Sequence, residues 1–369
     1  MPASERGWRP VSRQAHLRLA LLGVLLMGAP PAAAQDWLVF QGVADGEFWA
    51  SDSGSRLLTR NDGHPGLLGR LYLWTGVAPA ARLQLVALTE MAAGSALNED
   101  AEVSLEGLTL RYTPFRALVI EGGKLVSPVG AFGPRRFSPT NPLIGQPDAY
   151  STAYPWAGQL SGSVSHLDYR VAVVSLPAVH EDYVPEPQAI PRLVVGGGVT
   201  PVVGVRVGAS FTRGPYLSDE LSPLIPAGNG WKDFKQEVLA FDGRVSRGYL
   251  EFHGELDYSW YDVPTISGRV SGVAYYAEVK YTWSPRFFSA ARFQRNDYPF
   301  VLPLSRAQWI GKAVNFYAGE AGIGIRLDQH TLAKISYQQD NWTASPNGRA
   351  VAVQLSYQFD VREWLARRQ

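Results

Sequence analysis

Apolar and polar residues alternate one by one along much of the chain. In residues 249–260, for example, Leu250 and Phe252 fall on one parity, and Glu251 and His253 fall on the other. Successive side chains of a β-strand point to opposite faces of the sheet, so this pattern predicts strands with one apolar and one polar face. The same split recurs in residues 273–283, 317–327 and 351–359. The alternation therefore predicts an all-β protein.

The connections between the alternating stretches come in two lengths. Seven are tight turns, around residues 77–80, 113–116, 165–168, 200–203, 246–248, 284–286 and 327–330. Eight are longer and polar or rich in Pro and Gly, near residues 52–66, 92–101, 128–155, 177–191, 214–233, 262–270, 297–315 and 341–349. Short and long connections follow one another in turn, which is how bacterial outer-membrane barrels are built. A soluble β-sandwich or propeller would also alternate apolar and polar residues, but neither predicts the two lengths.

We therefore expect a transmembrane antiparallel β-barrel of about sixteen strands. In hydrocarbon an unpaired backbone N–H or C=O is costly, so a sheet that spans a membrane has to close on itself. A barrel of this size leaves an aqueous lumen, whereas a barrel of eight strands is filled by its own side chains. Aromatic residues near the short turns, such as Trp74 and Trp283, are expected in the girdle at the membrane interface.

The N-terminal residues predict export. Four arginines precede the apolar run 19–27, and small residues follow that run up to Ala34. The run is too short to span a bilayer, which needs about 20 apolar residues, and its flanks fit a cleaved signal peptide over residues 1–34. A buried N-terminal helix is the alternative. With the signal peptide removed, residues 35–369 would form the barrel in the cell outer membrane, with lipid around its wall.

Composition narrows the range of functions. Charged residues make up 18% of the chain, and 34 Lys and Arg nearly cancel 33 Asp and Glu, for a net charge of +1. That balance excludes nucleic-acid binding through a strongly basic surface. The absence of cysteine excludes disulfides, thiolate zinc sites and thiol catalysis. We expect no cofactor, no bound metal and no nucleic-acid partner.

The longest connection, residues 128–155, has the properties of a folded functional loop. Its many Pro and Gly residues keep it from extending the strands, yet it carries Phe132, Phe137 and Leu143 to pack with. Loops of this length without secondary structure of their own are usually functional or disordered. The apolar content favours a loop that folds inward and narrows the lumen.

In these features the chain resembles the Gram-negative outer-membrane porins. In the sixteen-stranded general porins the third long loop folds into the barrel and forms the constriction, and residues 128–155 hold that position. Residues 123–130, Gly-Lys-Leu-Val-Ser-Pro-Val-Gly, also look like the G-(K/Q)-x-x-x-P-x-G stretch of the phosphate-selective porins. The chain departs from those porins because its few lysines form no ladder, and from porins in general because a C-terminal tail, residues 360–369, follows Phe359. The resemblance implies a homotrimer.

The resemblance also implies that charged residues of the loop form a pore constriction. Arg135 and Arg136 are the best candidates, with Asp148 as an acid in the same constriction. The alternatives are that the two arginines tie the loop to carboxylates of the wall or lie at the mouth, and that Asp148 is a turn residue. On the wall, parity places twelve pore-lining residues inward: Arg206, Arg244, Glu251, His253, Glu255, Asp257, Glu278, Lys280, Arg292, Glu320, Arg326 and Lys334. Their mixed signs predict weak charge selectivity at most.

Two hypotheses for the function follow. The first is a porin through which small hydrophilic solutes or ions diffuse passively. The second is a barrel that serves as a scaffold or receptor for a protein partner or a specific ligand. An enzyme is not expected, because His253 lies between Glu251 and Glu255 on one strand, where residues two apart are separated by about 7 Å and cannot form a compact site.

Overall fold

The computed structural model describes residues 37–52, 65–95, 101–147, 154–175, 190–342 and 347–361. The predicted signal peptide, residues 1–34, and residues 362–369 of the predicted C-terminal tail lie outside these ranges. None of the helices in the described ranges is long and apolar enough to cross a membrane.

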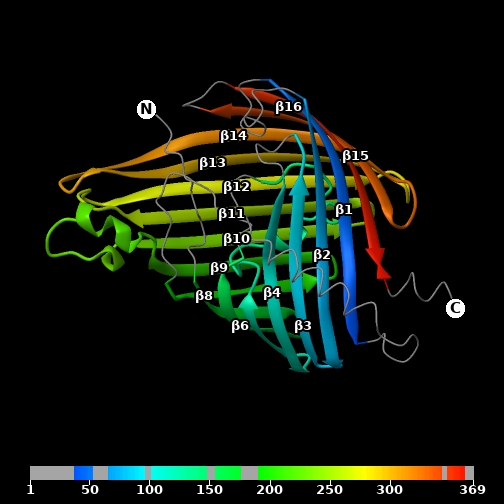
Figure 1. Ribbon diagram of the computed structural model, residues 1–369, viewed down its shortest axis with the longest axis horizontal. Helices are drawn as coiled ribbons and strands as arrows, with labels where there is room; N and C mark the ends of the chain where they lie inside the picture. Colours follow the sequence, from blue (N-terminus) through cyan, green and yellow to red (C-terminus); the bar gives the residue numbers. More distant parts are fainter. Residues whose placement is uncertain are drawn as a thin grey trace.

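Sixteen antiparallel strands close into a barrel (Figure 1). Each strand pairs with its neighbours in the chain, and β1 pairs with β16, which closes the sheet. The prediction of an all-β barrel of sixteen strands is confirmed. The strands are β1 (Leu38–Ser51), β2 (Gly66–Ala80), β3 (Leu83–Ala93), β4 (Glu102–Phe115), β5 (Leu118–Lys124), β6 (Trp156–Val164), β7 (Leu167–Val174), β8 (Arg192–Val202), β9 (Val205–Pro215), β10 (Lys235–Arg247), β11 (Leu250–Asp262), β12 (Arg269–Thr282), β13 (Phe287–Ser305), β14 (Gln308–Arg326), β15 (Thr331–Trp342) and β16 (Gly348–Asp360). Among the described residues, three short 3-10 helices lie in the connections: η2 (Gly133–Arg135), η3 (Asp219–Leu224) and η4 (Trp231–Asp233).

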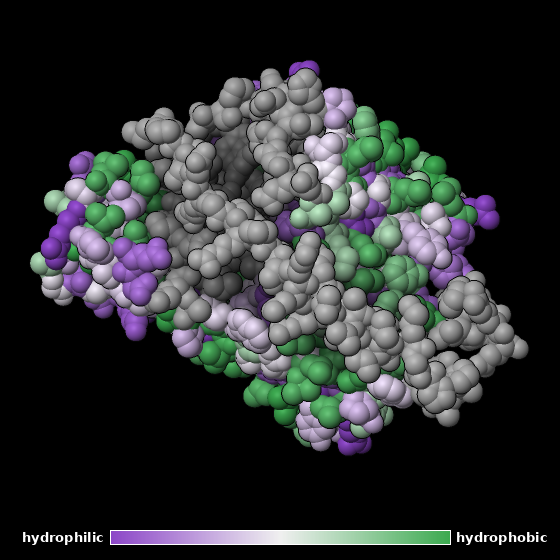
Figure 2. All heavy atoms as spheres, in the orientation of Figure 1, coloured by the Kyte–Doolittle hydropathy of each residue, from purple (hydrophilic) through white to green (hydrophobic). Residues whose placement is uncertain are grey.

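The strands carry the predicted alternation of faces. In β11, Phe252 is 42% exposed whereas the next residue, His253, is 8% exposed. Along the strands the exposed parity is largely apolar, and the covered parity carries most of the buried polar side chains. Figure 2 shows hydrophobic residues gathered over the wall strands, and a concentration of hydrophilic residues at the left end of the view. A closed sheet pairs its backbone N–H and C=O groups internally and has an apolar outer face, which are the properties needed to span a lipid bilayer.

Tight turns join the strands at one end of the barrel, in agreement with the sequence pattern. Between β10 and β11 only two residues intervene, and one of them, Gly248, has a φ of +61°. Glycine adopts this left-handed conformation without steric cost, so it suits a turn of this length.

One long connection differs from the prediction. Residues 297–315, expected as a loop, instead continue β13 and β14 as a paired hairpin, which projects beyond its neighbours in Figure 1. Val301 and Trp309 on this hairpin are buried in an apolar cluster with Tyr216, which follows β9. The register shifts beside Pro303, where the irregularity accommodates a residue without an N–H. Packing between distant segments extends these strands, and local sequence does not show it.

Candidate functional site

Residues 125–147, here called the loop segment, follow β5 and contain η2. The loop segment forms hydrogen bonds with polar residues on eleven strands, far more than a connection between neighbouring strands needs. The wall residues in contact, one each from β1, β3, β4, β7, β9, β11, β12, β13, β14, β15 and β16, are Asp45, Glu90, Glu106, Arg170, Ser210, Glu255, Glu278, Arg292, Glu320, Lys334 and Ser356. These contacts fix a segment that has little secondary structure of its own.

Arg292 on β13 is the centre of the tightest group of contacts. Its guanidinium is almost completely buried and pairs with Glu278 on β12 at 2.6 Å and with Glu320 on β14 at 3.5 Å. It also donates to the carbonyl of Gly145 at 2.8 Å and to the side-chain oxygen of Asn141 at 2.7 Å. One buried cation thus serves two wall carboxylates and two loop oxygens. Without it, both carboxylates would lose a counter-charge in a buried position.

Glu320 holds the same part of the loop segment through its backbone. Its Oε1 accepts the N–H of Ile144 at 3.2 Å and the N–H of Gly145 at 2.9 Å. A Cβ at position 145 would lie 2.6 Å from the other carboxylate oxygen, so glycine permits the approach. Hydrogen bonds to a charged acceptor are stronger than neutral ones, which makes this a firm attachment.

Lys334 on β15 fixes the adjacent turn of the loop segment. Its buried ammonium group donates to the carbonyls of Ser138, Asn141 and Leu143, at 3.1, 3.0 and 2.9 Å. An ammonium group has three donors, so all three are satisfied by loop backbone. The Ser138 hydroxyl in turn donates to Asp45 on β1 at 2.7 Å. Strands from both sides of the β1–β16 closure therefore hold this turn.

Both arginines predicted for the constriction bind carboxylates of the wall. Arg135 Nη2 lies 2.5 Å from Glu278 Oε1. Arg136 is buried, and its Nη2 lies 3.4 Å from Glu90 and 3.3 Å from Glu106. The contacts of both residues match the alternative interpretation, in which the arginines tie the loop to the wall.

Aromatic rings surround Arg136. Its Cζ lies 4.8 Å from the ring centroid of Tyr154, 5.1 Å from that of Phe137 and 5.7 Å from that of Tyr72. A desolvated guanidinium near aromatic faces gains cation–π attraction in addition to its ion pairs. Burial raises the pKa of the Tyr154 hydroxyl above its ordinary value, so this phenol stays neutral beside the cation.

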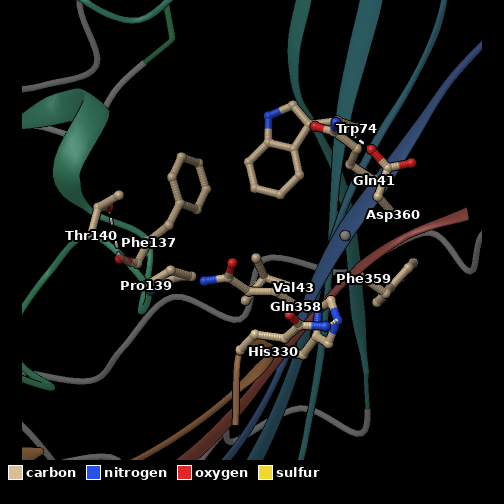
Figure 3. A pocket seen from close by; sticks show the side chains of 12 residues that line it. Gln41, Val43, Trp74, Phe137, Pro139, Thr140, His330, Gln358, Phe359 and Asp360 are labelled. Carbon is tan, nitrogen blue, oxygen red and sulfur yellow. Dashed lines mark hydrogen bonds between the residues drawn. The ribbon is translucent and has the colours of Figure 1, made fainter. Parts of the chain in front are cut away.

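Trp74 corrects one expectation about the aromatic girdle. It shares the polar face of β2 with Tyr72, and its ring centroid lies 4.8 Å from that of Phe137. The prediction that Trp74 lies at the membrane interface is wrong, because the loop segment offers it an aromatic partner on the inner parity. Figure 3 shows Trp74 and Phe137 beside a cavity of about 530 Å³ that is also lined by Thr140 and His330.

The twelve wall residues predicted to point inward all lie on the covered, polar parity of their strands. Five of them bind the loop segment: Glu255, Glu278, Arg292, Glu320 and Lys334. Arg206 forms ion pairs with Asp168 at 2.8 Å and with Asp242, two other residues of the wall. Asp257 is a buried residue of β11. The remaining five line a second cavity near Arg135: Arg244, Glu251, His253, Lys280 and Arg326. Asp148 lies outside the described residues.

Sequence reasoning missed several wall residues that bind the loop segment. Asp45 and Glu90 lie on the inward parity of β1 and β3, so the same alternation could have found them. Glu106 could also have been found, because it shares its parity with Ser104 while Val103 and Leu105 are exposed. The register of β3 and β4 shifts beside Leu88 and leaves Glu106 as an extra residue. Such a bulge redirects a side chain, and here it allows Glu106 to reach Arg136.

The closed barrel of sixteen strands has the fold of outer-membrane β-barrel proteins. It is similar to OmpF of Salmonella typhi in complex with daunomycin, with a TM-score of 0.58 and 13% identity over 87% of this chain and 97% of that chain. It is also similar to outer-membrane-expressed OmpT of Vibrio cholerae, with a TM-score of 0.57 and 10% identity over 87% and 97% of the two chains. The trimer form of in-vitro-folded OmpT from the same organism is similar with a TM-score of 0.56 and 11% identity, over 87% of this chain and 99% of that chain.

At these identities the likeness shows the fold alone. No protein-family model and no curated protein matches the sequence. The resemblance of residues 123–130 to the phosphate-selective porins therefore gains no support from these comparisons.

Proposed function

We propose that the protein is an outer-membrane porin, through which small hydrophilic solutes or ions diffuse passively. The observation that carries the proposal is the attachment of the loop segment to eleven strands, with cavities left between the segment and the wall. In this proposal the loop segment lies in the lumen and narrows it without filling it. Barrels of sixteen or more strands have an interior wide enough for an aqueous channel.

The cavities beside the loop segment support a water-filled path. One has about 530 Å³ and includes Thr140 in its lining, and a second of about 260 Å³ also reaches Thr140. A third, of about 500 Å³, lies against Pro128 and Pro134 and is lined on the wall by the ion pair of Arg111 and Glu121. Charged and hydroxyl side chains in these linings favour water and hydrophilic solutes over lipid.

We also propose that the protein resides in the outer membrane. An apolar outer face suits lipid, and the similar structures come from outer-membrane proteins, which supports an outer-membrane location for this chain. The trimer form of one similar structure supports a homotrimer. We propose no catalytic residue and no cofactor.

Single-channel recording tests the proposal directly. The mature chain is refolded in detergent, its β-structure is verified by circular dichroism, and it is added to a planar lipid bilayer in KCl. We expect stepwise increases in conductance, and swelling of liposomes that contain the protein when small sugars are supplied outside. A folded barrel that inserts and gives neither conductance nor sugar flux would contradict a porin and would favour a scaffold or receptor.

A further inference from the structure

Strands β10 to β14 carry a second group of charged residues nearer to the short turns than Arg292 and its partners. They line the cavity of about 260 Å³ together with Arg135 and four other residues of the loop segment. We call this group the basic pocket and define it by Arg135, Arg244, Glu251, His253, Lys280 and Arg326. Its position on the polar parity places it beside the solute path of the proposed pore.

Cations outnumber acids in the basic pocket. Lys280 pairs with Glu251 at 2.7 Å, whereas Arg244 and Arg326 form no ion pair with any described residue. Phe288 helps to position two of the cations, since Lys280 Nζ and Arg326 Cζ each lie 5.4 Å from its ring centroid. Three wall cations therefore face one carboxylate.

Arg135 adds a free donor from the loop segment. Its Nη2 is taken by Glu278, but its Nη1 is buried and has no hydrogen-bond partner among the described residues. A buried donor without an acceptor costs about 1–3 kcal/mol, which an incoming oxygen atom would recover. The basic pocket thus contains a guanidinium N–H that can donate a hydrogen bond to an incoming acceptor.

The nearby acids are committed to other partners. Glu278 is shared by Arg135 and Arg292, and Glu320 binds Arg292 and loop N–H groups. Glu255 accepts the N–H of Ala131 at 3.0 Å. From the sequence alone, these acids were predicted to be charges of the lumen, and charge selectivity was expected to be weak at most. Their use in holding the loop segment leaves the basic pocket with positive charge in excess.

We propose that the basic pocket selects small oxyanions, which are solutes that carry carboxylate or phosphate groups. This inference rests on the proposed porin function and names the class of solute that the pore favours. Guanidinium groups match the oxygens of carboxylate and phosphate with paired donors. Fixed positive charge in a narrow cleft also raises the local concentration of anions. A cavity of about 260 Å³ suits solutes of a few carbon atoms.

The reversal potential across a bilayer with a tenfold KCl gradient measures this selectivity. We expect chloride to be favoured over potassium by about threefold or more. The preference should be larger at 0.1 M than at 1 M salt, because the Debye length falls from about 10 Å to about 3 Å. Inorganic phosphate and succinate, each added at millimolar concentration, should reduce the chloride current, whereas glucose should not.

Two double variants locate the selectivity. Arg244→Gln with Arg326→Gln should bring the permeability ratio close to one and remove the effects of phosphate and succinate. Arg213→Gln with Arg269→Gln removes the same charge from an exposed group around Glu237 at the long-loop end, and should leave the ratio unchanged.

The outcomes separate this inference from the proposed function. A conducting channel without anion preference would overturn the inference. So would an anion preference that persists in the Arg244→Gln/Arg326→Gln variant, here called the pocket variant. In both cases the proposed porin function would still stand. Absence of conductance in the unaltered protein and in both double variants would contradict the proposed porin function. If only phosphate or only succinate competes, the pocket still selects oxyanions and the solute is identified further. If the pocket variant fails to fold, the salt dependence and competition in the unaltered protein decide.

Discussion

Arg292 and Arg326 lie on adjacent strands and face the same side of the barrel wall, yet their surroundings differ completely. Arg292 is buried between two carboxylates and two oxygens of the loop segment. Arg326 contacts the ring of Phe288, faces a cavity and has no acid partner among the described residues. The loop segment accounts for the difference, because it covers the first residue and leaves the second open. A charge on this wall is buried in ion pairs where the loop segment binds it, and it faces a cavity where the loop segment does not.

The largest predicted effect comes from removing the covered cation. Arg292→Met leaves Glu278 and Glu320 buried with less compensation, so we expect a loss of about 3–5 kcal/mol in the free energy of unfolding. Guanidinium titration of the refolded barrel, followed by tryptophan fluorescence, measures it. The matched change Arg326→Met should cost less than about 1 kcal/mol, because no buried ion pair is broken. Equal losses would show that the loop segment does not create the difference.

A smaller effect is expected for the lysine that holds the loop backbone. Lys334→Met leaves three buried carbonyls without their shared donor, and we expect a cost of about 1–3 kcal/mol. Faster proteolysis within the loop segment, read by mass spectrometry, would accompany it. Lys280→Met is the control, since Lys280 is only partly buried and binds no loop carbonyl. Similar proteolysis of the two variants would rule out a specific attachment by Lys334.

A pair of glycines sharpens the comparison at one contact point. Gly130 has a φ of +74°, and a Cβ there would collide with the Glu255 carboxylate, whereas Gly228 has a φ of +93° and open space around it. Gly130→Ala and Gly228→Ala should both cost about 1 kcal/mol from backbone strain. Denaturant titration should show a further loss of about 1 kcal/mol for Gly130→Ala, because the bond from Ala131 to Glu255 is displaced. An equal loss in both variants would contradict the close packing of loop and wall.

The smallest effect concerns the one carboxylate among the described residues of the basic pocket. Glu251→Gln keeps the shape of the side chain and removes the charge that partly offsets Lys280. We expect the anion preference to rise by about twofold, with a change in the free energy of unfolding below about 1 kcal/mol. The reversal potential measures the first quantity and denaturant titration the second. A lower anion preference would mean that Glu251 does not face the path.

The barrel fold could be predicted from the sequence because the signals for it lie within each strand and its adjacent connections. Alternation identifies the two faces, and the rhythm of short and long connections identifies the strand number, so both predictions depend only on residues close in the chain. Trp74 and residues 297–315 were misjudged because their environments come from distant partners, Phe137 and the cluster around Tyr216. The bulge at Glu106 shifts parity by one residue, so the outward apolar residues are Val103 and Leu105 before it and Leu110 and Tyr112 after it.

The candidate site was predictable in composition but not in its pairings. Parity found Glu278, Arg292 and Glu320 as inward residues, and the loop pattern found Arg135 and Arg136. Which acid binds which base depends on how the loop segment lies across the wall, and that arrangement involves residues up to 218 positions apart. For this reason the sequence suggested mixed charge throughout, whereas the structure separates a neutralised group from a basic one.

Labelling of a single cysteine on the loop segment tests the central claim most directly, because the chain has no cysteine of its own. Thr140 is exposed and lines two of the cavities beside the loop segment, and Ala321 is exposed on the outer face of β14. During single-channel recording, a charged methanethiosulfonate reagent should lower the conductance of the Thr140→Cys channel and leave that of the Ala321→Cys channel unchanged. Complete labelling of Thr140→Cys without any change in current would contradict a pore narrowed by the loop segment.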